Sequence, residues 1–276
     1  MDEKVFFYFL TQLFYFFGVV FLIGFLISLI NRYFYRLVRY NRAVCLGTGL
    51  LGTPIHELSH AAMCVVFGHK ITKMRLFQPD DENGVLGFVE HSYNPKKLWH
   101  VIGNYFIGVA PIVCGSAFIL LLTSWLLPHS FDDMIDSIEA FARFKGDVFS
   151  SEWFEAFGEV FFGVILAIVT ASFAEWEIWV FLIFAMCIAL HMNLSGADIK
   201  NALPSIPVLA IILFVANLVL SLISGALYRD YLEAIALVGG FLSGTMLLSV
   251  VLSLAYLLVG FLIKTALNLI FRRRLF

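Results

Sequence analysis

The feature that most constrains this chain is a series of long apolar runs separated by short polar segments. The first run, VFFYFLTQLFYFFGVVFLIGFLISLI at residues 5–30, contains no charged residue. It exceeds the roughly 20 residues that a helix needs to cross a bilayer. Further apolar runs cover residues 43–68, 98–127, 157–173, 176–194, 205–227 and 234–270. Because backbone groups in lipid must be hydrogen-bonded within their own segment, these runs predict transmembrane helices.

The composition agrees with a protein that lives in a membrane. Hydrophobic residues make up 61% of the 276 residues and charged residues only 14%, a balance that one water-soluble core cannot hide. We therefore expect an all-α polytopic integral membrane protein with about six or seven transmembrane helices, folded as one domain over residues 1–276. The net charge of −2 leaves no basic surface for nucleic acid, so the expected surroundings and partners are the lipid bilayer and membrane proteins.

Charges near the apolar runs predict the orientation. Four arginines follow the first run within residues 32–42, and the chain ends in FRRRLF. The positive-inside rule places both clusters in the cytoplasm, and seven crossings then place the amino terminus outside and the carboxyl terminus inside. The acidic start, MDEK, favours a retained span over a signal peptide. The compact chain suggests a bacterial plasma membrane.

Two polar inserts separate the runs. Residues 70–93 contain KITKMRL, with period-two alternation, then a PDDENG turn and a second short stretch; this predicts a β-hairpin. Residues 128–156 mix acidic and aromatic side chains, which is typical of an amphipathic helix along a membrane surface.

The segment GTPIHELSH, at residues 52–60, places titratable groups inside an apolar run. In a helix, His56 and His60 share one face, so both imidazoles can bind one ion with Glu57 beside them. This is the HExxH pattern of zinc peptidases. Thr53 and Pro54 fit the N-cap and first position of a helix that starts here, after an irregular glycine-containing entry.

A catalytic zinc site needs a third protein ligand and an open position for water. A carboxylate in the membrane costs about 2.5 to 3.5 kcal/mol and marks a functional site by default, although hydrogen bonding between helices is an alternative role for these side chains. Among later polar residues, Asp198 follows an apolar run at a break that contains Gly196, and His191 lies within the run. We favour Asp198 as the third ligand, with His191 as the competitor.

Other potential ligands carry no predicted role. The cysteines lie in apolar runs without a CxxC spacing, which favours small packing residues over a disulfide or a thiolate zinc site; they are Cys45, Cys64, Cys114 and Cys187. His69, His91 and His100 flank the predicted hairpin and fit residues at a membrane interface.

These motifs together resemble the site-2 protease family, the intramembrane zinc metallopeptidases. HELSH is followed by Gly68 eight residues after His60, then by the hairpin with KMRLF and GVLGFVEH, and later by MNLSGADIK. The resemblance covers about residues 50–115 and 190–205 and indicates a divergent or minimal member. It implies Zn²⁺ held by His56, His60 and Asp198, with Glu57 as the catalytic base.

The same resemblance implies a membrane-spanning or membrane-proximal protein substrate. A transmembrane helix must be unwound before cleavage, and an exposed hairpin edge can hold an extended segment by pairing with its backbone. The candidate substrate contacts are Met74, Leu76, Leu86 and Phe88 on the hairpin and Asn193 beside the third ligand. A hairpin that merely joins two spans is the alternative. The sequence leaves the oligomeric state open.

Two other classes compete with a peptidase. Membrane hydroxylases and desaturases use many clustered histidines around iron, whereas this chain has seven scattered histidines with one HxxxH pair. A catalytically inactive scaffold that retains a protease-like fold and binds other helices is the main alternative, and it predicts no need for Glu57.

Overall fold

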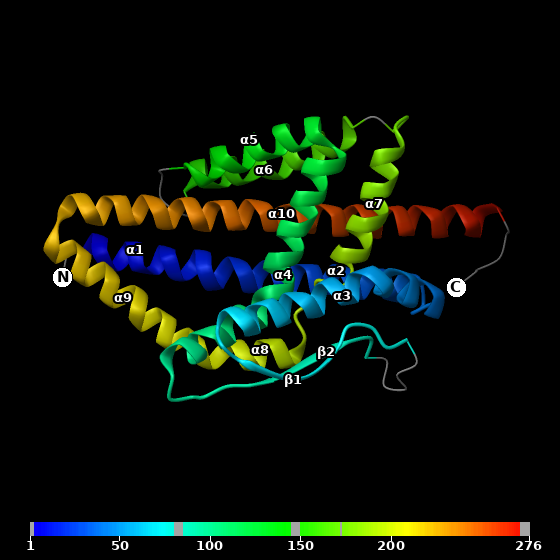
Figure 1. Cartoon of the computed structure of the whole chain (residues 1–276). Helices are drawn as coiled ribbons and strands as arrows, with labels where there is room; N and C mark the ends of the chain where they lie inside the picture. Colours follow the sequence, from blue (N-terminus) through cyan, green and yellow to red (C-terminus); the bar gives the residue numbers. More distant parts are fainter. Residues whose placement is uncertain (1–2, 80–84, 145–149, 172, 271–276) are drawn as a thin grey trace.

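The computed structural model describes residues 3–79, 85–144, 150–171 and 173–270, and most of its regular structure is helical (Figure 1). α1 (Glu3–Leu13), a π-helical segment (Phe14–Val19) and α2 (Val20–Leu37) follow one another without a break. The other elements, in chain order, are α3 (Arg42–Val66), β1 (Lys70–Arg75), β2 (Phe88–Ser92), α4 (Leu98–Leu126), α5 (Pro128–Ala142), α6 (Ser151–Val169), α7 (Trp176–Ala189), α8 (Gly196–Ala202), a 3₁₀ turn (Leu203–Ser205), α9 (Ile206–Ile223) and α10 (Gly225–Ile270).

Two groups of elements lie on opposite sides of the long α10 and α1–α2 helices in Figure 1. α5 and α6 pack against each other and against α10 on one side, while α3, α8 and the hairpin lie on the other. α4 and α7 run between the two sides, and both contact α3 and α10. The candidate site residues therefore lie on the side of α3 and α8, next to the ends of α4 and α7 that contact these helices.

The predicted number of spans is too high. Among the described residues, four helical segments are long and apolar enough to cross a membrane: Val5–Leu37, Leu98–Leu126, Gly196–Ile223 and Gly225–Ile270. These make the chain compatible with a multi-pass membrane protein, and the all-helical class with one small sheet is confirmed. The predicted side of the carboxyl terminus stays a prediction, and its arginine cluster lies outside the described residues.

Three apolar runs do not form full spans, each for a physical reason. α7 has 14 residues and is about 21 Å long, which is less than the thickness of a bilayer's hydrocarbon core, about 30 Å. α6 carries three glutamates in its first nine residues, and α3 has a polar interior that includes the HExxH residues. Apolar composition alone could not show these interruptions.

α3 begins earlier than predicted, so Thr53 is not its N-cap. The helix starts after Asn41, whose side-chain oxygen accepts hydrogen bonds from the backbone N–H groups of Ala43 (2.9 Å) and Val44 (3.3 Å). Pro54 lies inside the helix, and the predicted irregular entry is helical. Gly52 faces α7, where an added Cβ would collide with the carbonyl oxygen of Cys187. A glycine there lets α3 and α7 approach closely.

The end of α3 leads directly into the hairpin. Gly68 has a φ of +70°, which glycine adopts without steric cost. The N–H of Gly68 bonds to the carbonyl of Val65, and the N–H of His69 bonds to the carbonyl of Cys64, as in a Schellman motif. The chain therefore reverses sharply and enters β1 beside the helix end.

The predicted hairpin is confirmed. β1 and β2 pair antiparallel, with Lys70 opposite Ser92 and Arg75 opposite Phe88. The register shifts between Ile71 and Lys73, so Thr72 forms a bulge, and its hydroxyl donates to the carbonyl of Glu90 at 3.1 Å. Most of the predicted PDDENG turn lies outside the described residues.

The described part of the insert at residues 128–156 is mostly helical, made of α5 and the start of α6. α5 turns one face inward, with Met134, Ile138 and Phe141 buried, and this face packs on α6 and α10. Gly240 and Gly244 of α10 lie against Ala142 and Ile138. The amphipathic helix is thus present, and its apolar face covers another helix.

The core fills the space between the helices. Its fully buried side chains include Ile27 of α2, Ile112 of α4, Phe181 of α7 and Met246 of α10. A hydrogen bond of 2.9 Å between the hydroxyls of Ser116 and Ser249 joins α4 to α10. This packing fixes α4 and α7, which hold the groups around the candidate site.

Candidate metal centre

His56 and His60 lie one helical turn apart on α3, with their rings nearly perpendicular and their Nε2 atoms close together. Their Nε2 atoms are 3.2 Å apart, and the ring centroids are 4.9 Å apart. The side chain of His60 is buried, with 7% of the residue exposed. The HExxH spacing therefore gives the predicted convergence of the two imidazoles.

Two backbone carbonyls, one in α4 and one just after α7, orient these rings. The Nδ1–H of His56 donates to the carbonyl oxygen of His191, and the Nδ1–H of His60 donates to that of Ile107, each at 2.7 Å. A histidine that binds a metal usually donates its other ring N–H in this way. Ile107 lies in α4 and His191 follows α7, so both helices help to set the geometry of the site.

Asp198 reaches the pair from α8, far along the chain. Its Oδ1 lies 3.3 Å from His60 Nε2, and its Oδ2 accepts a hydrogen bond from the backbone N–H of Ser195 at 2.8 Å. The hydroxyl of Ser195 in turn accepts from the backbone N–H of Asp198 at 3.1 Å, which forms a capping box. The cap of α8 thus fixes the carboxylate in its orientation.

A small residue on α4 lets α8 come this close. A Cβ added at Gly108 would meet the carbonyl oxygen of Asp198 at 2.6 Å and the Cβ of Ala202 at 2.9 Å. α4 therefore contributes twice to this centre, since it orients His60 through Ile107 and gives Asp198 room through Gly108.

His56, His60 and Asp198, which we call the HExxH cluster, fit a zinc ion. Their ligand atoms lie within 4.8 Å of one another. His60 Nε2 is 3.2 Å from His56 Nε2 and 3.3 Å from Asp198 Oδ1, and ligands that are 2.0–2.1 Å from a tetrahedral zinc ion are also about 3.3 Å apart. Since both rings donate through Nδ1, their neutral forms have lone pairs on both Nε2 atoms. Two lone pairs and a carboxylate that face one another form a donor set that could hold a cation.

Glu57 lies beside this cluster under the hairpin. The residue is 6% exposed, and a Cβ added at Gly87 would meet Glu57 Cγ at 2.9 Å and Thr53 Cγ2 at 2.7 Å. The segment before β2 therefore covers this part of α3. The buried hydroxyl of Thr53 has no hydrogen-bond partner among the described residues. An orphaned buried polar atom is a place where ordered water is expected.

His191 and Asn193 hold the chain around the centre through internal hydrogen bonds. The imidazole of His191 donates from Nδ1 to the carbonyl of Cys187 at 3.0 Å, so the structure brings Asp198, and not the His191 ring, to the histidine pair. The Oδ1 of Asn193 accepts from the Asn31 amide at 3.0 Å, and its Nδ2 donates to the carbonyl of Leu190 at 3.1 Å. The predicted substrate contact of Asn193 is untested.

The predicted hairpin contacts face different surroundings. Leu86 packs toward α3, where its Cδ1 would be 2.7 Å from a Cβ at Gly49. The ring of Phe88 lies under the ammonium group of Lys73, 4.9 Å from its centroid. Met74 is 39% exposed, and Leu76 is half-buried. Met74 is therefore the most accessible of the four to a partner.

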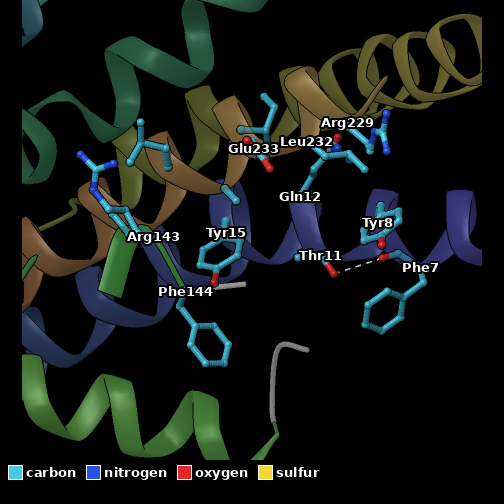
Figure 2. A pocket seen from close by; sticks show the side chains of 14 residues that line it. Phe7, Tyr8, Thr11, Gln12, Tyr15, Arg143, Phe144, Arg229, Leu232 and Glu233 are labelled. Atoms are coloured by element: carbon cyan, nitrogen blue, oxygen red, sulfur yellow. Dashed lines mark hydrogen bonds between the residues drawn. The ribbon is translucent and has the colours of Figure 1, made fainter. Parts of the chain in front are cut away.

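A separate cavity of about 480 Å³ lies between α1, α5 and α10 (Figure 2). Gln12, Arg143, Arg229 and Glu233 supply its polar lining. None of the HExxH cluster residues lines it, so this cavity is distinct from the candidate metal centre.

Sequence reasoning missed the groups that orient the ligands. The carbonyls of Ile107 and His191 are backbone atoms, which no side-chain motif reveals. Ser195 did have a readable signal, because Ser-x-x-Asp is a capping-box pattern that ends on the third candidate ligand.

Comparisons with known proteins leave the family open. No protein-family model, curated protein or solved structure matches this chain. The geometry above is therefore the basis for a function.

Proposed function

We propose that this protein is an intramembrane zinc metallopeptidase of the site-2 protease type, which hydrolyses peptide bonds of membrane-spanning or membrane-proximal proteins. The observation that carries the proposal is the convergence of His56, His60 and Asp198, with both imidazoles locked by backbone carbonyls so that their Nε2 lone pairs face one another. A merely structural polar cluster has no need to aim three acceptors at one point.

The zinc ion, when bound, supplies Lewis acidity and lowers the pKa of a water to about 7. His56, His60 and Asp198 would hold it, and their partners at His191, Ile107 and Ser195 keep the ligands in place during turnover. Two imidazoles and one carboxylate leave a fourth position for water or substrate.

Glu57 is the proton carrier in this proposal. As the neighbour of His56 on the same helix turn, it accepts the proton of the attacking water and passes it to the leaving amine. Its burial beneath Gly87 separates it from bulk water, so the proton stays within the site. The Thr53 hydroxyl, which has no hydrogen-bond partner in the described part of the chain, lies one turn before Glu57 and offers a hydrogen-bonding group to the water that must reach it.

The hairpin is the proposed guide for the substrate. It runs over Thr53 and Glu57 at Gly87, and a two-stranded sheet has unpaired edges that an extended segment can join. An unwound stretch of substrate beside the hairpin would place its carbonyl groups close to α3.

The test uses zinc-loaded protein in proteoliposomes with a panel of single-span peptides labelled at both ends. Wild-type protein should cleave members of the panel, and Glu57→Gln should lower turnover by about 10²- to 10⁴-fold, the usual contribution of a general base, without loss of zinc. A Glu159→Gln control on α6 should cleave as wild type does. Equal turnover by Glu57→Gln and wild type, or no cleavage of any peptide by the zinc-loaded wild type, contradicts the proposal and favours the scaffold.

A further inference from the structure

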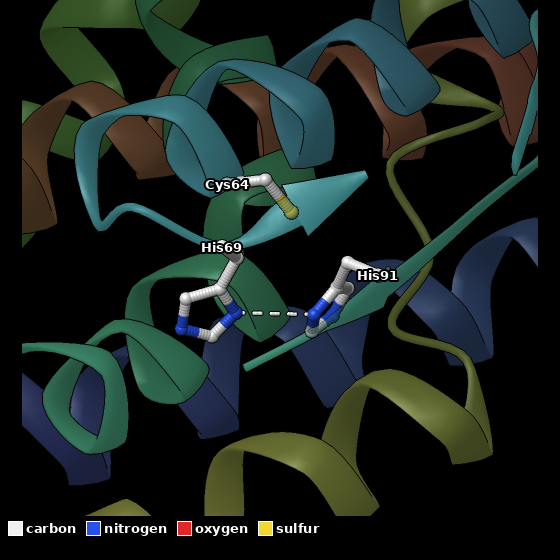
Figure 3. Close-up of side chains that lie close together, drawn as sticks. All are labelled: Cys64, His69 and His91. Atoms are coloured by element: carbon white, nitrogen blue, oxygen red, sulfur yellow. Dashed lines mark hydrogen bonds between the residues drawn. The ribbon is translucent and has the colours of Figure 1, made fainter. Parts of the chain in front are cut away.

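A second group of ligand-type side chains lies where α3 meets the hairpin. Cys64, His69 and His91, here called the hairpin cluster, place one sulfur and two imidazole nitrogens within 4.8 Å of one another (Figure 3). Cys64 belongs to α3, His69 lies in the reversal after it, and His91 belongs to β2. The cluster therefore joins the end of α3 and the turn after it to β2.

The Schellman motif at the end of α3 brings Cys64 and His69 together. The N–H of His69 donates to the carbonyl of Cys64 at 2.8 Å, and Gly68, which precedes His69, takes the left-handed conformation that the motif requires. The side chains of both residues are buried, with 0% and 5% of the residues exposed. Figure 3 shows the Cys64 sulfur directed from the helix toward the two rings.

The bulge in β1 lies next to the strand position opposite His91. His91 pairs with Ile71, and the register shifts immediately after this pair. Bulges re-aim side chains on a sheet. Here the Nδ1 of His91 lies 3.1 Å from the Nδ1 of His69.

The hydrogen bonds of His69 fix which of its nitrogens is free. Its Nε2–H donates to the carbonyl of His100 at 2.8 Å, so Nδ1 carries the lone pair that faces His91 and Cys64. This is the same arrangement that orients ligating histidines elsewhere. Burial lowers the pKa of His69, and burial together with the neighbouring His69 and His60 lowers the pKa of His91.

We propose that Cys64, His69 and His91 form a second metal site, which binds Zn²⁺ and clamps the hairpin to the end of α3. A thiolate with two imidazoles suits a soft or borderline ion such as zinc. The 3.1 Å separation of the two Nδ1 atoms is close to the about 3.3 Å between nitrogen ligands of tetrahedral zinc. On binding, the Cys64 thiol would release its proton to solvent, and the ring proton of His91 would move from Nδ1 to Nε2, which leaves a lone pair on Nδ1 for the ion.

The clamp would fix the hairpin at the end opposite its other contact with α3. Leu86 packs at Gly49, and Gly87 lies over Thr53 and Glu57, while the hairpin cluster holds His91 beside Cys64. With both ends fixed, the hairpin keeps its position along the helix. The proposal stands without any peptidase activity, because it depends only on these three side chains.

The test is a cobalt titration of the metal-stripped, purified full-length chain. Co²⁺ bound by a thiolate gives a charge-transfer band in the near ultraviolet, and the HExxH cluster contains no thiolate. Wild-type protein should show this band, and one equivalent of Zn²⁺ per cluster should remove it. Cys64→Ser should lack the band, and His69→Asn should weaken cobalt binding at this site at least tenfold.

Two matched controls guard against general damage. Cys45→Ser changes a partly buried cysteine at the start of the same helix, and His129→Asn changes an exposed histidine on α5; both should keep the band. His91→Asn provides a second variant on the hairpin should Cys64→Ser fail to fold. A folded wild-type protein without the band, or a band that survives Cys64→Ser, overturns the second site and indicates a hydrogen-bonded histidine pair only.

Discussion

The HExxH cluster and the hairpin cluster differ in how the chain builds them. The first joins α3 to α8, and its ligands depend on carbonyls from Ile107 and His191. The second is assembled within residues 64–91 by a helix cap and a bulged hairpin. Long-range packing therefore controls the first cluster, whereas local backbone geometry controls the second.

Because of this difference, we expect the two clusters to respond to different mutations. Changes in helix packing or in the cap of α8 should affect the HExxH cluster, and changes at the end of α3 should affect the hairpin cluster. Each cluster has a ligand on α3, and His60 and Cys64 are only one turn apart. A mutation that affects metal binding at one cluster and not at the other is therefore a demanding test of this difference.

The largest effect is expected for His60→Ala. His60 Nε2 lies beside both His56 and Asp198. Loss of a residue that only orients a metal ligand lowers metal affinity by up to about 100-fold. Loss of the ligand His60 should lower the zinc affinity of the HExxH cluster by more than this and abolish peptide cleavage. The cobalt–thiolate band of the hairpin cluster should remain. Simultaneous loss of both metals in a folded variant would show that the clusters are one unit.

Gly87→Ala should separate catalysis from metal binding. The new Cβ would lie 2.7 Å from Thr53 Cγ2 and 2.9 Å from Glu57 Cγ, so either the hairpin or Glu57 must move. A displacement of about 1 Å lowers turnover by roughly 10²-fold, while both metals stay bound. Cleavage assays with Gly158→Ala as control, where no atom lies within 4 Å, check this; unchanged turnover by Gly87→Ala would mean that the hairpin does not constrain Glu57.

Ser195→Ala should weaken the HExxH cluster alone. The variant removes the hydroxyl that caps α8 and should cost about 1 kcal/mol of stability, with about a tenfold loss of zinc affinity because Asp198 is less well oriented. Chelator competition gives the affinity. Ser150→Ala, which removes the corresponding cap of α6, should cost similar stability and leave zinc affinity unchanged; equal loss of zinc in both variants would contradict a specific role of Ser195.

Gly68→Ala is expected to have the smallest effect, on the hairpin cluster. A non-glycine residue at a φ of +70° destabilises this turn by about 1 kcal/mol. If the turn becomes less ordered, the same free energy corresponds to about a fivefold loss of cobalt affinity at Cys64 and His69. Gly47→Ala on the same helix, where no atom lies within 4 Å, is the control. A greater loss at the HExxH cluster than at the hairpin cluster would reverse the comparison.

The sequence predicted those features that depend on the regular spacing of residues in a helix or a strand. HExxH predicted the histidine pair because a helix repeats every 3.6 residues, and alternation predicted the hairpin. It also selected Asp198 over His191 as the more suitable third residue, and the structure brings Asp198 to the pair. Its role in binding a metal stays a prediction until an ion is observed.

Other features depended on contacts that no spacing encodes. The start of α3 at Arg42 was missed because Thr53–Pro54 looks like a helix start in isolation, whereas the earlier segment is helical and its Gly52 packs on α7. The number of spans was overestimated because apolar runs do not reveal where a helix ends. Cys64 was interpreted as a packing residue, since its neighbours in space come from a helix cap and a strand bulge.

The most direct test of the central claim is anomalous scattering at the zinc edge from crystals of the purified protein. We expect a peak within bonding distance of His56 Nε2, His60 Nε2 and an Asp198 carboxylate oxygen. A well-ordered map that shows these three side chains in place after zinc loading, without a peak between them, would contradict it.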